Sequence, residues 1–130
     1  MKPKILIVSA RYYRTISKNL EFYSSKKIKN ISKYKFIYVP GVFEIPVVIS
    51  KNIKKFDGFI ALGCVIKGET PHFDFISQAT TNSIMNLSVE YKKPIGNGII
   101  TSLNNNQALK RSKKKGQEAA KAVLSVLENF

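Results

Sequence analysis

The stretch Gly58 to Ile66 reads GFIALGCVI, and it runs directly into KGETPHFDF, residues 67–75. Its first part is a continuous apolar run, which is typical of a strand buried on both faces of a parallel sheet. Its second part passes through a Gly-Glu-Thr-Pro turn to His72, the only histidine of the chain. Because α/β proteins bind ligands beyond the carboxyl ends of parallel strands, we expect a site in this segment.

Two interpretations of this segment are open. Histidine titrates close to neutral pH, and the first turn of a following helix would present N–H groups that suit phosphate, so the segment could combine a proton carrier with an anion site. Alternatively, His72 is a solvated residue at a helix end and Gly68 is only a turn residue, which is the more common case for a lone histidine. The rest of the chain decides between them.

The remaining sequence alternates strands with helices. Further short apolar runs predict strands at Lys4–Ser9, Lys35–Val39 and Ile95–Thr101. Apolar residues at helical spacing predict helices over about 15–29, 45–53, 73–91, a short stretch from 102 to 111, and 116 to the end. Between the last two helices, the lysines at 113–115 are expected to form a solvated charge run. Four strands that alternate with helices predict a three-layer α/β/α sandwich with a four-stranded parallel sheet.

Length and composition limit the class of protein. The chain has 130 residues with 44% hydrophobic and 23% charged residues, which predicts one globular domain over 1–130. Its one cysteine, Cys64, cannot form an internal disulfide, and one cysteine with one histidine argue against an all-protein zinc site. The apolar run at residues 5–10 is too short for a secretion signal, and we expect no amino-terminal arm because the first predicted strand begins close to Met1. We expect a cytoplasmic protein that does not span a membrane.

The formal net charge of +14 is the one extreme value. Such a charge favours binding to nucleic acid. However, nearly all of it comes from lysines that are scattered along the chain, and no basic stripe or nucleic-acid motif is present. We therefore expect no nucleic-acid partner.

Polar features lie at or near the carboxyl end of each predicted strand. They are Tyr12, the pair Phe43-Glu44, the segment Cys64–His72 and the segment Asn97–Ser102. We expect all four to meet at one rim, since the carboxyl ends of parallel strands lie at the same edge of the sheet. Glycines at 96 and 98 within the last strand predict a close approach by a ligand or a neighbouring backbone. This convergence favours the interpretation of the segment as a functional site over the interpretation of His72 as a solvated residue at a helix end.

Three ordered blocks carry a resemblance to a known family. They are PGVFEIP at 40–46, LGCVIKGETPHFDF at 62–75, and GNGIIT with QALKR between Gly96 and Arg111. These blocks resemble the signature segments of lumazine synthase, in register over nearly the whole chain. The resemblance implies a flavodoxin-like fold and condensation of 5-amino-6-(D-ribitylamino)uracil with 3,4-dihydroxy-2-butanone 4-phosphate, in the penultimate step of riboflavin synthesis. It implies no metal or organic cofactor.

The resemblance also assigns residues to the ribityl-pyrimidine substrate. Tyr12 would stack on the pyrimidine, where the family usually has phenylalanine, and Glu44 would accept ribityl hydroxyl protons. Cys64 would line the site through its backbone and would not be a nucleophile, and Asn97 would reach the pyrimidine from a neighbouring subunit. The implied set is Tyr12, Val42, Phe43, Glu44, Cys64, Val65, Ile66 and Asn97.

The second substrate carries a phosphate, and the resemblance places three residues on it. Glu69 and Thr70 would cradle the phosphate at the start of a helix, and Arg111 would clamp it. Arginine suits this role because its planar fork can grip two phosphate oxygens. His72 would act as the proton shuttle.

The sequence departs from the family pattern at two places. Tyr13 stands where the family commonly has asparagine, and the segment between Arg111 and Gly116 is shorter than usual, with Lys115 near its end. Family members form homopentamers, and some assemble these into a hollow sixty-subunit shell. The expected lack of an amino-terminal arm and the shortened segment after Arg111 both affect regions tied to assembly, which favours a free pentamer here. Riboflavin synthase, which consumes the product, is the protein partner that the resemblance suggests.

One alternative function remains open beside the enzyme. A non-catalytic relative that binds a flavin or lumazine would keep the aromatic pocket but would not turn over substrate. The combination of His72, Thr70 and Arg111 speaks against such a carrier, because a carrier needs no phosphate clamp beside a proton shuttle.

Overall fold

The structure is a computed structural model that describes residues 1–68 and 72–128 of the chain. Its elements along the chain are β1 (Lys4–Ala10), α1 (Arg14–Ile28), β2 (Lys33–Val39), the short 3-10 helix η1 (Val42–Glu44), α2 (Ile45–Asn52), β3 (Gly58–Ile66), α3 (Phe73–Tyr91), β4 (Ile95–Ser102) and α4 (Asn105–Glu128). The four strands form one parallel sheet in the order β2-β1-β3-β4. In the described part of the chain, no helix is long and apolar enough to cross a membrane.

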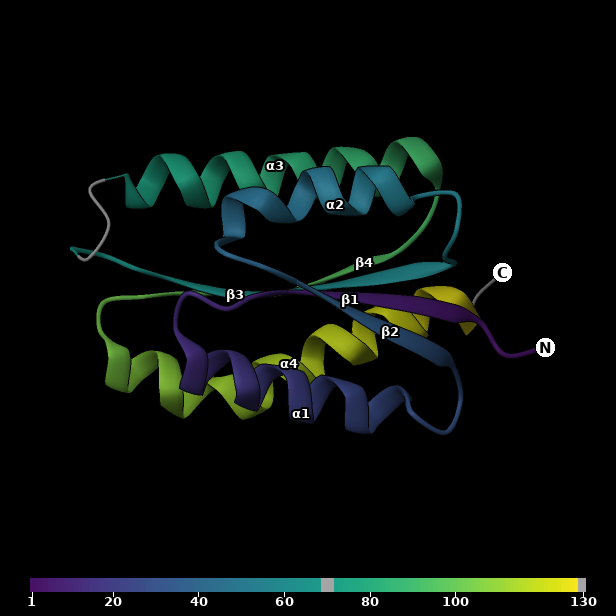
Figure 1. The fold of residues 1–130 in the computed structure, drawn as a ribbon, viewed down its shortest axis with the longest axis horizontal. Coiled ribbons are helices and arrows are strands. Elements are labelled where there is room, and N and C mark those ends of the chain that lie inside the picture. Colours follow the sequence, from purple (N-terminus) through teal and green to yellow (C-terminus); the bar gives the residue numbers. More distant parts are fainter. Residues whose placement is uncertain (69–71, 129–130) are drawn as a thin grey trace.

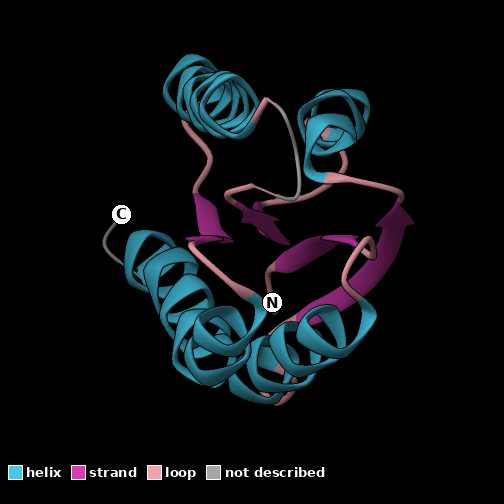
Figure 2. Cartoon of the chain, turned by 90° about the vertical axis from the view of Figure 1, so that its left-hand side faces the viewer, coloured by secondary structure: helices cyan, strands magenta, loops and turns pink. Residues whose placement is uncertain are grey.

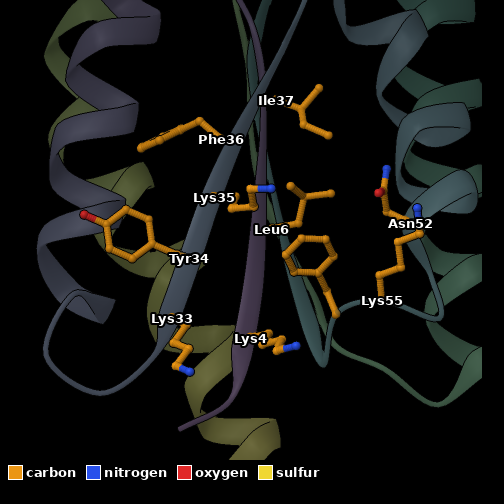
Figure 3. A pocket seen from close by; sticks show the side chains of 10 residues that line it. Lys4, Leu6, Lys33, Tyr34, Lys35, Phe36, Ile37, Asn52 and Lys55 are labelled. Carbon is orange, nitrogen blue, oxygen red and sulfur yellow. The ribbon is translucent and has the colours of Figure 1, made fainter.

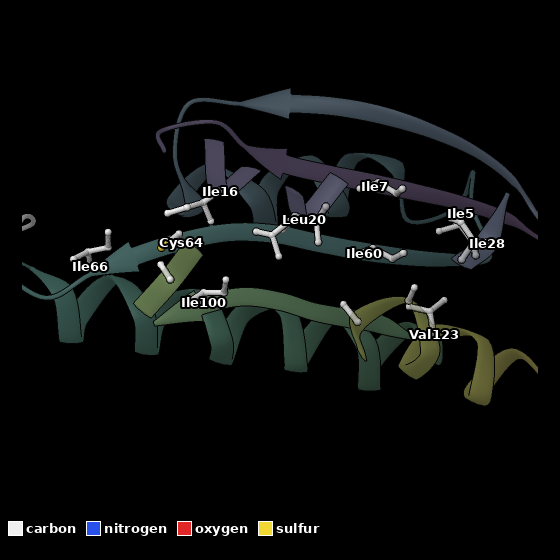
Figure 4. Packing of buried hydrophobic residues seen from close by; sticks show 14 residues of the cluster. Ile5, Ile7, Ile16, Leu20, Ile28, Ile60, Cys64, Ile66, Ile100 and Val123 are labelled. Atoms are coloured by element: carbon white, nitrogen blue, oxygen red, sulfur yellow. The ribbon is translucent and has the colours of Figure 1, made fainter. Parts of the chain in front are cut away.

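Helices cover both faces of the sheet. Figure 1 shows α2 and α3 on one side, and α1 and α4 on the other. Along β1, Ile5 and Ile7 pack with α1 and α4, whereas Leu6 and Val8 pack toward the opposite layer, because successive side chains of a strand point to opposite faces. Figure 4 shows the first of these two cores. The predicted three-layer α/β/α sandwich is therefore confirmed.

The central strand β3 is buried along its full length and reaches further than its neighbour β1. The β1–β3 pairing ends at Ser9 with Leu62, but the β3–β4 pairing continues to Ile66 with Ser102. Residues 63–66 of β3 therefore have a paired strand only on the β4 side. Figure 2 looks onto this end of the sheet, where the strands finish.

Helix α4 differs from the sequence prediction. Residues 105–128 form one continuous helix, so the prediction of two helices separated by a solvated run at 113–115 was wrong. Lysine and arginine are good helix formers, and a glycine does not necessarily break a helix that is held by packing. Gly116 is buried, and a Cβ at this position would lie 2.9 Å from the carbonyl oxygen of Leu20 in α1. The glycine thus allows α1 and α4 to approach closely.

The predicted close approach at the glycines of β4 is confirmed. A Cβ on Gly96 would collide with the carbonyl oxygen of Ala119, which lies in α4. The neighbour is therefore the backbone of this chain, and packing alone explains the glycine.

Candidate active site

Tyr12 lies in the short turn between β1 and α1, at the carboxyl end of the sheet. Its side chain is 68% exposed and meets the ring of Tyr13 edge to face, with 4.9 Å between the ring centroids. Tyr13 is half-buried and packs against the α1/α4 core. The two neighbouring tyrosines therefore differ in their surroundings: Tyr13 is anchored in the core, and Tyr12 is exposed to solvent.

The segment PGVFEIP forms η1 and the start of α2. Glu44 closes η1, and its Oε1 accepts a hydrogen bond of 3.0 Å from the backbone N–H of Gly41. Val42 is buried beneath this turn, whereas Phe43 is 65% exposed. Pro46 falls in the first turn of α2, where its missing N–H removes no helical hydrogen bond.

Gly63 brings η1 onto the ends of β1 and β3. A Cβ on Gly63 would lie 2.5 Å from Cγ1 of Val42 and 3.2 Å from Cβ of Ala10. Only a residue without a side chain leaves room for these two neighbours at once. The turn that holds Tyr12 and the turn that holds Phe43 and Glu44 therefore both adjoin the extended end of β3.

The end of β3 offers backbone to this rim, because its side chains point into the cores. Cys64 and Ile66 belong to the core beneath α1 and α4, and Val65 belongs to the core beneath α2 and α3. Cys64 is only 8% exposed, which fits a wall residue.

His72 stands at the start of α3 on the same edge of the sheet. Its side chain is exposed, its carbonyl oxygen accepts a hydrogen bond of 2.8 Å from the N–H of Ile76, and its ring lies 6.4 Å from that of Phe75. Gly68, before it, has a left-handed φ of 88°, a conformation that glycine adopts at little cost. Glu69 and Thr70 lie outside the described residues. Among the residues that are described, no three His, Cys, Asp or Glu side chains are grouped as metal ligands would be.

Arg111 projects from α4 to the end of β4. Its Nη1 donates a hydrogen bond of 2.9 Å to the carbonyl oxygen of Thr101, and Lys67, just after β3, donates from its backbone to Ser102 at 2.9 Å. The guanidinium is therefore held where β3 and β4 end, on the side from which the chain continues toward His72.

A basic hollow of about 320 Å³ surrounds Arg111 on α4. It is lined by Lys110, Arg111, Lys114, Lys115 and Glu118. Sequence reasoning missed this cluster because it placed a loop at 111–116. The helical spacing of 111, 114 and 115 was the signal that these side chains share one face.

Asn97 does not join the rim. It is the third residue of β4 and pairs with Ala61, so it lies four residues, about 13 Å along the strand, before Thr101. Its Oδ1 accepts a hydrogen bond of 3.0 Å from the N–H of Ile99, and it lines a small hollow of about 130 Å³ beside Ile84 and Met85 of α3. The expectation that Asn97 meets the other polar features at one rim of this chain was wrong, because Asn97 lies near the beginning of β4 and the rim lies at the carboxyl end of that strand.

Comparison with known proteins decides the family. The family model for 6,7-dimethyl-8-ribityllumazine synthase matches residues 2–130. The chain belongs to this family. It is 42% identical to the 6,7-dimethyl-8-ribityllumazine synthase of Bartonella tribocorum, over 97% of this chain and 89% of that protein. It is 40% identical to the one of Agrobacterium fabrum, over 98% of this chain and 94% of that protein.

A likeness to one solved structure concerns the fold alone. The crystal structure of the ABC domain in complex with L-Trp from Streptococcus pneumonia superimposes with a TM-score of 0.50 at 14% identity, over 98% of this chain and 41% of that chain. At this identity, only the α/β architecture is shared.

A larger hollow of this lumazine synthase family member lies at the opposite end of the sheet. It measures about 590 Å³ and opens between the edge strand β2 and the end of α2, with Leu6, Ile37 and Phe56 among its apolar residues and Lys35 and Lys55 among its basic ones (Figure 3). None of the residues assigned to substrate lines this hollow. The family assignment therefore directs attention to the rim and not to the larger hollow.

Proposed function

We propose that this chain condenses 5-amino-6-(D-ribitylamino)uracil with 3,4-dihydroxy-2-butanone 4-phosphate to give 6,7-dimethyl-8-ribityllumazine. The observation that carries the proposal is the match to the lumazine synthase family over residues 2–130. The rim at the carboxyl ends of the strands supports it, because an exposed aromatic ring, a carboxylate, a histidine and an arginine all lie along this edge.

The ribityl-pyrimidine binds, on this proposal, between Tyr12 and the end of β3. The exposed ring of Tyr12 offers a face for stacking on a planar heterocycle, and the backbone of Val65 and Ile66 offers hydrogen-bonding groups. Val42 and Phe43 form the side of the pocket, and Glu44 receives the ribityl hydroxyls. Because the Oε1 of Glu44 already accepts from Gly41, the carboxylate is held in a fixed orientation for those hydroxyls.

The phosphate of the second substrate binds at the start of α3 and on Arg111. The first turn of a helix favours an anion, and a guanidinium adds a bidentate, charge-assisted contact. Glu69 and Thr70 complete the cradle on this proposal. The neighbouring lysines of α4 add positive charge around the same place.

His72 serves as the proton carrier of the proposed reaction. An amine of the pyrimidine adds to the ketone, water leaves to give an imine, phosphate is eliminated, and the ring closes on the second carbonyl. Each step moves a proton close to neutral pH, and one exposed imidazole near the reacting carbons could serve several of them. Holding the two substrates together supplies much of the remaining acceleration.

A second copy of the chain completes the site on this proposal. Asn97 is exposed near the beginning of β4, beside the exposed Met85 of α3, so it would reach a pyrimidine bound to the rim of an adjacent subunit. We infer a homo-oligomer in which each interface joins the rim of one chain to the β4/α3 face of the next, and we favour a free pentamer.

The test is direct. The purified protein is mixed with both substrates, and the lumazine is followed by its absorbance and fluorescence against the uncatalysed background. Formation well above background supports the enzyme. Tight binding of lumazine or riboflavin without any formation would instead support the non-catalytic carrier.

A further inference from the structure

Arg11, the residue just before Tyr12, is held by contacts with two elements, α1 and β2. Its Nε and Nη2 donate to Oε2 and Oε1 of Glu21 in α1, at 3.1 and 2.8 Å. Its guanidinium lies over the ring of Tyr38 in β2, 3.6 Å from the centroid. Its backbone N–H donates to the carbonyl oxygen of Val39 at 2.9 Å.

Glu21 is a buried carboxylate whose other contacts fix it as well. It is 8% exposed, and its Oε2 also accepts a hydrogen bond of 2.6 Å from Ser9, which is fully buried in β1. The hydrogen bond to Glu21 raises the pKa of Arg11 above its ordinary value, although burial lowers it, so Arg11 remains charged at every pH of interest. This fork of two hydrogen bonds joins the start of the Tyr12 turn to the middle of α1.

Stability alone does not explain such a pair. A buried ion pair loses hydration that apolar side chains of the same size would not lose, so its net contribution to the free energy of unfolding is small. A bidentate pair does, however, fix the orientation of both groups. The turn after β1 has one further tie, because Ser17 Oγ lies 2.7 Å from the carbonyl oxygen of Ala10 and 3.0 Å from that of Tyr13.

Tyr12 itself is the exposed member of this turn. Its ring is 68% exposed and touches Tyr13 only at an edge. The backbone on both sides of Tyr12 determines where its Cα lies and in which direction its side chain leaves the turn. Arg11 fixes one side, and Ser17 with Tyr13 fixes the other.

We propose that Arg11 and Glu21 are positioning residues for the reaction, which hold the turn after β1 so that Tyr12 is placed where the pyrimidine stacks. The inference rests on the proposed function. Arg11 reaches substrate only through Tyr12, so its loss weakens the binding of the pyrimidine and leaves the phosphate substrate unaffected. Lysine at position 11 keeps the charge but loses the two-pronged contact and most of the stacking on Tyr38.

The experiment is a double-mutant cycle between Arg11→Lys and Tyr12→Ala, with KM for each substrate and the affinity for the lumazine product as readouts. We expect Arg11→Lys to raise the pyrimidine KM about tenfold, which is in the range of one lost base-stacking contact, with the phosphate KM unchanged. In a protein that already carries Tyr12→Ala, Arg11→Lys should not raise the pyrimidine KM any further. Glu21→Gln, which keeps the size of the side chain, should reproduce the effect.

The controls separate the inference from folding and from the function itself. Arg14→Lys, at an exposed arginine three residues away, should leave both KM values unchanged. The inference is overturned if Arg11→Lys leaves the pyrimidine KM at the wild-type value, or if its effect adds in full to that of Tyr12→Ala. A wild-type protein that makes no lumazine would overturn the proposed function, and the inference with it.

Discussion

Arg111 Nη1 donates a hydrogen bond of 2.9 Å to the carbonyl oxygen of Thr101, and this bond holds the guanidinium at the end of β4. Thr101 pairs with Val65 of β3, so the same guanidinium is also close to the end of the central strand. An arginine has five N–H donors, and one bond to a carbonyl leaves others for an anion. Arg111 is exposed, so a ligand can reach it.

Arg111→Ala should therefore weaken the binding of the phosphate substrate. We expect its KM to rise about 10- to 100-fold, as for one lost charge-assisted contact, with little change in the pyrimidine KM. Arg111→Lys should recover part of the loss, because it keeps the charge without the fork. Initial rates with each substrate varied in turn measure this, and Lys121→Ala on the same helix is the matched control. An equal rise in both KM values would show that Arg111 supports the rim as a whole and does not bind the phosphate.

The basic hollow on α4 should make the reaction sensitive to salt. Lys110 and Lys114 add positive charge beside Arg111, which should attract a phosphate-bearing substrate over a distance that salt screens. We expect kcat/KM for that substrate to fall about fivefold between roughly 20 mM and 0.5 M salt. Lys110→Gln with Lys114→Gln should flatten this dependence.

The control for the salt effect removes the same charge elsewhere. Lys51 and Lys54 are exposed near the end of α2, at the other end of the sheet, and Lys51→Gln with Lys54→Gln should leave the salt dependence as in the wild type. If both double variants flatten it equally, the net charge of +14 and not the hollow attracts the substrate.

His72→Ala should slow the reaction without abolishing it. A positioned acid or base contributes about 10²- to 10⁴-fold, and we expect a loss near the lower end because the two substrates remain held together. The measurement is kcat at saturating substrates, with binding of both substrates checked separately. A variant that folds, binds both substrates and shows no turnover at all would refute the account in which proximity dominates.

Most strands and helices of the fold could be predicted from the sequence because each depends on a local pattern of apolar residues. The strand over residues 58–66 is apolar throughout, and all nine of its residues are buried. The break that the sequence predicted within α4 was wrong, because Gly116 looks like a boundary when read alone. Its real role is contact with Leu20, a residue far away in the chain, and no local pattern shows such a contact.

Only part of the candidate site could be predicted from the sequence. Motif resemblance selects Arg111, but its bond to Thr101 depends on how α4 packs beside β4. The fork between Arg11 and Glu21 joins residues ten apart, one after a strand and one in the middle of a helix, and no helical or strand spacing predicts it. Asn97 was placed at the rim because its strand ends there, although it lies near the beginning of that strand.

Gly63→Ala should lower stability by crowding Val42. The added Cβ would lie 2.5 Å from Cγ1 of Val42, so η1 must shift, and overpacking of this kind costs about 1–3 kcal/mol. Urea unfolding measures the loss. In a double variant with Val42→Ala, the loss should be smaller than the sum of the two single losses, because the shorter side chain removes the clash. Strict additivity would mean that another neighbour, such as Ala10, causes the strain.

Asn97 allows a test of whether the site is shared between subunits. Asn97→Ala and Tyr12→Ala should each weaken the binding of the pyrimidine, the first from the β4/α3 face and the second from the rim. If the two residues act across an interface, a mixture of the two variants that is unfolded and refolded together contains some interfaces in which an intact Asn97 meets an intact Tyr12. The mixed sample should then bind lumazine with a tight fraction that neither variant shows alone. Separately refolded variants, mixed afterwards, are the control. Binding by the co-refolded sample that equals the average of the two variants would place Asn97 and Tyr12 in the site of one chain, or would remove Asn97 from the site altogether.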